Sequence, residues 1–255
     1  MFDKLSSIVR KAGDIVLSAD MKKTELEVKS GPGDFVTKYD RAVQDMLCDE
    51  LKKLLPEAEF IGEESGLVNK KREGYCFIVD PIDGTTNFAW NYRHSAISIG
   101  LAYQEKMVLG LVYNPYMDEL FYAEAGKGAY LNGYQIYASK RSLKSGLVCF
   151  GTSPYDKTKA DATFSLAKLL YDNSLDVRRS GSAALDICYI ACGRCELYYE
   201  MALSPWDYAA ASLIASEAGG IITTLHGERL QFYNKTSVLA GGSRAYDDFW
   251  HVYKA

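Results

Sequence analysis

The pattern of apolar residues changes near residue 140, and this change limits the possible folds more than any other feature of the chain. Before it, apolar segments follow one another directly, over 94–103, 107–114 and 120–123. After it, short apolar segments alternate with helical stretches. Successive strands favour an antiparallel sheet, whereas strand–helix alternation favours an α/β arrangement. We therefore expect an α+β part over residues 1–140 and an α/β part over residues 141–255.

Helical periodicity and turn residues predict the remaining elements. Apolar side chains recur at helical spacing from Phe2 to Val16, which predicts an N-terminal helix and no signal peptide. A second helix is expected between an N-cap at Thr37 and Pro56, and a buried strand at Tyr75–Val79, ending at Asp80-Pro81. Later helices are expected around 158–172, 182–193, 206–218 and 244–253, and strands at 147–150, 175–178, 197–200, 221–224 and 238–240.

Charge and histidine content argue against two classes of function. The 255 residues include 33 acidic and 29 basic side chains, a net charge of −4, which argues against a basic nucleic-acid-binding surface. The three histidines lie far apart in the sequence, so carboxylates would hold any bound metal, which favours Mg²⁺. No apolar run approaches the ~18 residues of a membrane span. We therefore expect a cytoplasmic chain with no nucleic-acid or membrane partner.

Three of the six cysteines follow the spacing Cys188-x3-Cys192-x2-Cys195, which resembles the iron–sulfur motif of radical-SAM enzymes. The same stretch has helical periodicity that places Cys188 and Cys192 on one apolar face, and free cysteine is a common small core residue. Arg194 stands where the iron–sulfur motif usually has an aromatic residue. We favour the core interpretation and keep an iron–sulfur enzyme as an alternative.

The most specific chemistry lies in the string Asp80-Pro81-Ile82-Asp83-Gly84-Thr85-Thr86-Asn87-Phe88. Two carboxylates stand three residues apart where a strand ends, and Pro81 stiffens the turn between them. Gly84 allows a ligand to approach closely, and a helix beginning at Thr85 or Thr86 would present N–H groups beside the carboxylates. Such a combination of metal ligands and phosphate-binding N–H groups predicts phosphate hydrolysis. For a bare Asp-x-x-Asp, a turn capped by its own carboxylates would be the better interpretation.

This string resembles the signature of the inositol monophosphatase family, which comprises Mg²⁺-dependent, lithium-sensitive phosphatases related to fructose-1,6-bisphosphatase. Two further segments are similar to motifs of that family: Gly62-Glu63-Glu64-Ser65, and Trp206–Ile214 followed by Glu217-Ala218-Gly219-Gly220. Ala211 is a departure, because many members have glycine there. The resemblance implies a layered αβαβα sandwich of the sugar-phosphatase type. It also implies a homodimer, for which the tyrosine-rich middle strands would supply the interface.

The resemblance also implies a metal site for two to three Mg²⁺ ions. Its ligands would be Glu63, Asp80, the carbonyl of Ile82, Asp83 and Asp207. In this scheme Asp80 contacts two of the ions. Taken alone, Glu63 reads as a surface acid, and Asp207 as a first-turn acid in a helix with Ser204 as its N-cap.

The same resemblance implies that Glu63, Thr85 and Asp40 are catalytic, with Asp40 pairing with Thr85 to activate the attacking water. From the residues alone, Asp40 is an acid in the first turn of a helix capped by Thr37. Lys29 lies in a glycine-flanked stretch that could close over the site, and a solvated lysine is an equal alternative.

Substrate contacts are implied at Gly84, Thr85, Gly181, Ala183, Glu200 and Asp207. The backbone N–H groups near Gly181 and Ala183, and the carboxylate of Glu200, would meet hydroxyl groups of a sugar or cyclitol. The segment 151–154 ends a strand and is expected to line the same pocket. Arg178-Arg179 are either anion contacts or a solvated strand end.

These residues predict an inositol-phosphate phosphatase that hydrolyses myo-inositol monophosphate with metal-activated water. The expected binding partner is this substrate, a small phosphorylated polyol or sugar. Fructose 1,6-bisphosphate, a 3′-phosphonucleotide, NADP and histidinol phosphate are alternative substrates for the same chemistry. A non-catalytic interaction protein with the same fold is a further alternative.

Overall fold

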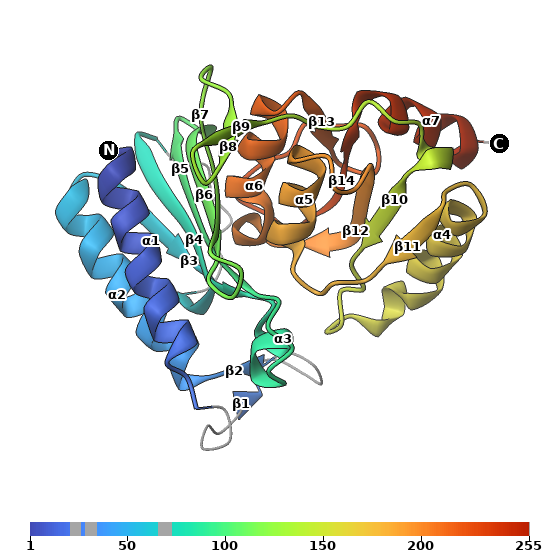
Figure 1. The fold of residues 1–255 in the computed structure, drawn as a ribbon. Helices are drawn as coiled ribbons and strands as arrows, with labels where there is room; N and C mark the ends of the chain where they lie inside the picture. Colours follow the sequence, from blue (N-terminus) through green and yellow to red (C-terminus); the bar gives the residue numbers. More distant parts are fainter. Residues whose placement is uncertain (21–26, 29–34, 66–72, 255) are drawn as a thin grey trace.

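Five alternating layers of helix and sheet make up the chain (Figure 1). The computed structural model describes residues 1–20, 27–28, 35–65 and 73–254. Helices α1 and α2 cover one face of a seven-stranded sheet, and α5 and α6 lie between that sheet and a five-stranded sheet. Helices α4 and α7 cover the outer face of the five-stranded sheet. This order of layers confirms the predicted αβαβα sandwich.

The α-helices occupy both parts of the chain. They are α1 (Phe2–Leu17), α2 (Lys38–Leu54), α3 (Thr85–Ala89), α4 (Ala160–Asp172), α5 (Ala183–Ala191), α6 (Pro205–Glu217) and α7 (Ser243–Tyr253). The strands of the larger sheet are β3 (Glu59–Gly62), β4 (Tyr75–Asp83), β5 (Ala96–Tyr103), β6 (Lys106–Asn114), β7 (Glu119–Glu124), β8 (Ala129–Leu131) and β9 (Tyr134–Ile136). Those of the smaller sheet are β10 (Leu147–Phe150), β11 (Asp176–Arg178), β12 (Leu197–Leu203), β13 (Gly220–Thr223) and β14 (Thr236–Gly242). A separate pair is β1 (Glu27–Val28) with β2 (Phe35–Val36).

The larger sheet places its strands in sequence order, and only the β3–β4 pair is parallel. Its side chains alternate between two cores, as the period of a strand requires. In β4, Phe77 and Val79 pack under α1 and α2, whereas Cys76 and Ile78 pack against the layer of α5 and α6. Both faces of β4 are thus buried, which explains why its first part, residues 75–79, is a continuous apolar run.

Helix α6 lies close against the larger sheet because glycines face it. A Cβ at Gly110 would stand 2.5 Å from the carbonyl oxygen of Ala210, and one at Gly100 would stand 3.3 Å from the Ala210 nitrogen. The small side chains of 209–211 complete this contact. The close approach brings the first turn of α6 to the end of β4.

The smaller sheet has the order β11-β10-β12-β14-β13, with parallel pairing among the first three strands and antiparallel pairing beyond. The change to strand–helix alternation after residue 140 therefore corresponds to a second sheet. The proposed division at residue 140 falls between β9 and β10, and two separate domains remain a proposal.

Two details of the predicted elements were wrong. Strand β4 does not end at Asp80-Pro81 but continues to Asp83, because Asp83 still pairs with Ala96 of β5. No strand was predicted between residues 123 and 147, where the structure has the hairpin β8–β9; its turn is Asn132-Gly133, both with positive φ. An Asn-Gly pair at this position is typical of a tight hairpin.

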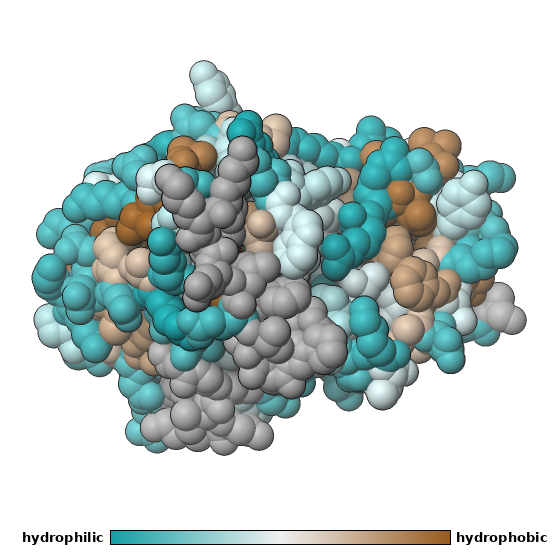
Figure 2. Space-filling view, turned by 90° about the horizontal axis from the view of Figure 1, so that it is seen from below, coloured by the Kyte–Doolittle hydropathy of each residue, from teal (hydrophilic) through white to brown (hydrophobic). Residues whose placement is uncertain are grey.

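Within the described ranges, no helix is both long and apolar enough to cross a bilayer. Among the residues that Figure 2 colours, hydrophilic ones predominate on the face seen from below, and apolar ones lie in separate groups.

Candidate active site

A β-bulge in β4 brings Asp80 and Asp83 to the same side of the strand. Residues three apart on a regular strand point to opposite faces, but the register shifts between Asp80, opposite Ser98, and Asp83, opposite Ala96. The backbone N–H of Ile82 donates to Asp80 Oδ1 at 3.0 Å, which fixes that carboxylate within the bulge. The bulge therefore turns an Asp-x-x-Asp spacing into a pair of neighbouring carboxylates.

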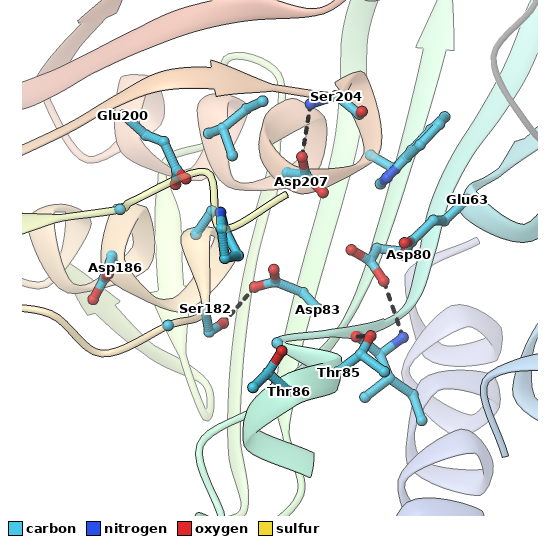
Figure 3. A pocket seen from close by; sticks show the side chains of 18 of the residues that line it. Glu63, Asp80, Asp83, Thr85, Thr86, Ser182, Asp186, Glu200, Ser204 and Asp207 are labelled. Carbon is cyan, nitrogen blue, oxygen red and sulfur yellow. Dashed lines mark hydrogen bonds between the residues drawn. The ribbon is translucent and has the colours of Figure 1, made fainter. Parts of the chain in front are cut away.

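Asp207 reaches the same point from the start of α6. Ser204 is the N-cap, Pro205 occupies the first turn, and Asp207 closes a capping box by accepting the Ser204 N–H on Oδ2 at 2.7 Å. One oxygen of each of Asp80, Asp83 and Asp207 lies within 4.8 Å of the other two (Figure 3). Elements far apart in the sequence thus form one acidic cluster, as the family resemblance implied.

The cluster is electrostatically unfavourable without a cation. Burial raises the pKa of Asp83 to about 7, despite hydrogen bonds from Ser182 and Ala184 that oppose the rise. Burial, with the nearby charges of Glu63 and Asp83, raises the pKa of Asp207 well above its usual value. Carboxylate oxygens at this spacing are the donor set that hard divalent cations prefer. The residues present therefore fit a Mg²⁺ site.

Glu63 and Ile82, the other two predicted ligands, line the same cavity of about 340 Å³ as the cluster. Glu63 begins a short 3₁₀ helix, η2 (Glu63–Ser65), directly after β3. The carbonyl of Ile82 accepts a hydrogen bond from the Thr85 hydroxyl at 3.1 Å. All five predicted metal ligands therefore meet at one cavity, while their roles as ligands remain proposals.

The Thr85 hydroxyl also lies 3.2 Å from Asp40 Oδ1, the pairing that the resemblance implied. Asp40 is fully buried and caps α2 with its other oxygen, which accepts the Thr37 backbone N–H at 2.7 Å and the Thr37 hydroxyl at 2.6 Å. The helix-capping interpretation of Asp40 is therefore confirmed. The contact with Thr85 is present, and the catalytic role of Asp40 stays a prediction.

Gly84 adopts a left-handed conformation, with φ of 86°, before the first turn of α3. A Cβ there would stand 3.0 Å from the carbonyl oxygen of Gly181. Helix α3 begins at Thr85, as predicted, and its first-turn N–H groups lie beside the acidic cluster.

The start of α5 also borders the cavity, where Gly181, Ser182 and Ala183 line the wall. The Ser182 hydroxyl and the Ala184 N–H, the latter at 2.9 Å, both donate to Asp83 Oδ2. Helix α5 thus holds one of the carboxylates of the cluster in place.

Glu200, on β12, lies at the other end of the cavity. Its Oε1 accepts the Ser153 N–H at 2.7 Å and the Ser153 hydroxyl at 3.2 Å, and its Oε2 accepts the Tyr198 hydroxyl at 2.7 Å. A Cβ at Gly151 would stand 1.8 Å from Glu200 Oε2, so a glycine there makes room for the carboxylate. Burial raises the pKa of Glu200 above its usual value.

Of the three basic residues considered for the site, only Arg179 is found at the cavity among the described residues. Arg179 lines the cavity and donates to the Thr152 hydroxyl at 3.1 Å. Arg178 instead forms an ion pair with Asp176 on the same strand, so it is the solvated strand end of the two interpretations. Lys29 lies outside the described residues.

Sequence reasoning missed three residues that line the cavity: Tyr155, Asp186 and Lys235. Tyr155 and Lys235 come from irregular segments with no motif, and the Lys235 ammonium lies 5.4 Å from the centre of the Tyr155 ring. Asp186 had a usable signal, because it is a charged residue within the apolar stretch 183–191.

The cysteines of the Cys188-x3-Cys192-x2-Cys195 spacing belong to the core or pack against it. Cys188 is buried in α5, and the Cys149 thiol donates to Cys195 at 3.1 Å, also within buried surroundings. In the part of the chain that the structure describes, three metal-ligating side chains gather only at Asp80, Asp83 and Asp207.

The fold and the cavity together define a five-layered α/β protein with a carboxylate cluster that could hold a metal ion beside helix N-termini, an arrangement suited to phosphate esters. The sequence matches the model of the inositol monophosphatase family over residues 2–252, so the chain belongs to that family.

Relatives within the family carry different names. The chain is 42% identical to inositol monophosphatase 2 of Solanum lycopersicum, covering 84% of this chain and 83% of that protein. It is 35% identical to Nus factor SuhB of Escherichia coli, covering 92% and 88%. Among solved structures, the extragenic suppressor protein SuhB of Bartonella henselae has a TM-score of 0.92 at 32% identity, covering 99% and 98%.

Proposed function

We propose that this chain is a phosphomonoesterase that hydrolyses myo-inositol monophosphate, in the form of inositol 1-phosphate, with two to three Mg²⁺ ions. The observation that carries the proposal is the convergence of Asp80, Asp83 and Asp207 at one cavity. Bound Mg²⁺ would supply the positive charge that neutralises the phosphate and lowers the pKa of water. The relative named inositol monophosphatase 2 supports the substrate class.

The chain's own residues would position the attacking water. The Thr85 hydroxyl donates to Asp40 Oδ1 or to the Ile82 carbonyl, so its oxygen lone pair is available to accept a hydrogen bond from the attacking water and so to orient it. Glu63 lies at the same cavity and would orient the water from a second side. Water oriented by these groups would attack phosphorus opposite the leaving oxygen.

Binding of the ester would use the rest of the cavity. First-turn N–H groups of α3, beyond Gly84, would bind phosphate oxygens. The backbone at Gly181 and Ala183 and the carboxylate of Glu200 would contact the hydroxyl groups of the leaving polyol.

A panel of phosphate esters assayed with Mg²⁺ tests the proposal. Inositol 1-phosphate should give the highest kcat/KM, above fructose 1,6-bisphosphate, a 3′-phosphonucleotide, NADP and histidinol phosphate. A chelator should abolish turnover, and Mg²⁺ should restore it. A higher kcat/KM on one of the other esters would move the assignment to that substrate.

The relatives named Nus factor support a second candidate, a non-catalytic interaction protein with the same fold. Mg²⁺ binding without turnover of any ester in the panel would favour it. The absence of a nucleic-acid partner also stays a prediction, and mobility shifts with RNA and duplex DNA test it.

Three further features stay predictions: a homodimer, inhibition by lithium, and a cytoplasmic location. Light scattering after size exclusion tests the first, and titration of turnover with LiCl tests the second. Fractionation of the cells that express the protein tests the third.

A further inference from the structure

Asp186 is a cavity residue that the proposed mechanism does not use. It comes from α5, and its side chain is only 1% exposed, yet it lines the same cavity as the acidic cluster. Asp186 and Glu200 lie on the side of the pocket away from Asp80 and Glu63 (Figure 3). Asp186 therefore belongs to the end of the cavity where the leaving group would lie.

The two carboxylates at this end differ in their hydrogen bonding. Glu200 already accepts three hydrogen bonds, from Ser153 and Tyr198, so most of its acceptor capacity is used. Asp186 Oδ1 is buried and has no hydrogen-bond partner in the described part of the chain. A buried acceptor without a donor is unfavourable, and a ligand that supplies the donor relieves that cost.

We propose that Asp186 is a specificity-determining residue that accepts a hydrogen bond from a hydroxyl group of the leaving polyol. The inference rests on the proposed phosphatase function and adds a contact to it. The sequence predicted contacts to the hydroxyl groups from Glu200 and from the backbone near Gly181 and Ala183. Asp186 adds an acceptor oxygen that the described part of the protein leaves unsatisfied.

The chemistry of this end favours a hydroxyl over a second phosphate. A neutral hydroxyl satisfies a carboxyl whether the carboxyl is protonated or ionised, because both forms keep an acceptor oxygen. Burial raises the pKa of Asp186 to about 8; a hydrogen bond from the Ser180 side chain opposes the rise, and the charges of Asp83 and Glu200 add to it. A phosphate at this position would meet two carboxyl groups instead of a donor.

The test compares inositol 1-phosphate with p-nitrophenyl phosphate, whose leaving group carries no aliphatic hydroxyl. Asp186→Leu keeps the branched shape of the side chain and removes the acceptor. It should raise KM for inositol 1-phosphate by about tenfold or more and leave KM for p-nitrophenyl phosphate within about twofold. Asp186→Asn keeps an acceptor oxygen and should recover most of the loss. The exposed Asp161, changed to Leu, is the matched control.

Equal changes for the two substrates, or no change, would overturn the inference. Monodeoxy analogues of inositol 1-phosphate provide a test on the unmodified protein: one of them should lose about tenfold in kcat/KM, and Asp186→Leu should abolish that difference. Uniform turnover of all analogues would also overturn it. Failure of the unmodified protein to hydrolyse inositol 1-phosphate would instead contradict the proposed function.

Discussion

Replacing Asp83 with asparagine should stabilise the metal-free protein while removing its activity. Burial raises the pKa of Asp83 from 3.8 to about 7. At about 1.36 kcal/mol per pKa unit, this rise corresponds to a cost on the order of 4 kcal/mol for the ionised form. Asparagine has no charge to bury. Its oxygen can still accept from Ala184, and its amide can donate toward the neighbouring carboxylates.

The sign of the pH dependence follows from the raised pKa. The folded carboxyl keeps its proton to higher pH than the unfolded one, so the cost is absent below about pH 4, grows as pH rises and is complete above about pH 7. Asp83→Asn should therefore raise Tm by about 10 °C at pH 8 in a chelator, and by little at pH 4. Mg²⁺ should stabilise the unmodified protein at pH 8 more than the variant.

Thermal unfolding at pH 4 and pH 8, with and without Mg²⁺, measures these differences. The exposed Asp161, changed to Asn, serves as the control, because its side chain faces solvent on α4. A variant that is less stable than the unmodified protein at pH 8, or equally changed at both pH values, would refute the electrostatic reasoning.

Three further predictions test other parts of the site. Asp83→Asn and Asp207→Asn should each lower kcat by at least about a hundredfold, measured at saturating Mg²⁺, and near-normal turnover would contradict the metal-site assignment. Gly151→Ala, whose Cβ would stand 1.8 Å from Glu200 Oε2, should raise KM for inositol 1-phosphate while p-nitrophenyl phosphate changes little; an unchanged KM would show that Glu200 can move without loss. Thr37→Ala removes the side-chain cap of α2 and should lower the free energy of unfolding by about 1 kcal/mol, measured by denaturant unfolding. It should also lower kcat, because Asp40 loses the hydrogen bond from the Thr37 hydroxyl. An unchanged unfolding midpoint would contradict the capping role.

Much of the fold was predictable because local signals agree with it. The caps at Thr37 and Ser204 mark the starts of α2 and α6, and helical periodicity gave α1. The end of β4 was not predictable, because Pro81 suggested a stop while the pairing of Asp83 with Ala96 carries the strand on. Such pairing depends on a partner strand that no local pattern reveals.

In the candidate site, too, residues within local motifs were predictable, and residues placed by tertiary packing were not. Residues within motifs, such as Asp80 and Asp207, were found because their motifs are specific. Asp186 and Lys235 were missed because their place in the cavity depends on how α5 and the irregular segment before β14 pack around it. The excess of four negative charges gave no hint of this arrangement, since the net charge does not show that several acids converge.

Two of the acids serve the fold and the site at the same time. Asp40 is the N3 residue of the capping box of α2, and Asp207 holds the same position in α6. In each, Oδ2 accepts the N-cap backbone N–H, at 2.7 Å in both cases. This bond fixes the carboxylate, so that Asp40 Oδ1 reaches Thr85 and Asp207 contributes an oxygen to the acidic cluster. The helix-capping interpretation of these residues is therefore compatible with their proposed roles, catalytic for Asp40 and metal-binding for Asp207. The cap supplies the rigid support that a metal site requires, because a carboxylate held at the backbone does not have to be ordered when the ligand binds.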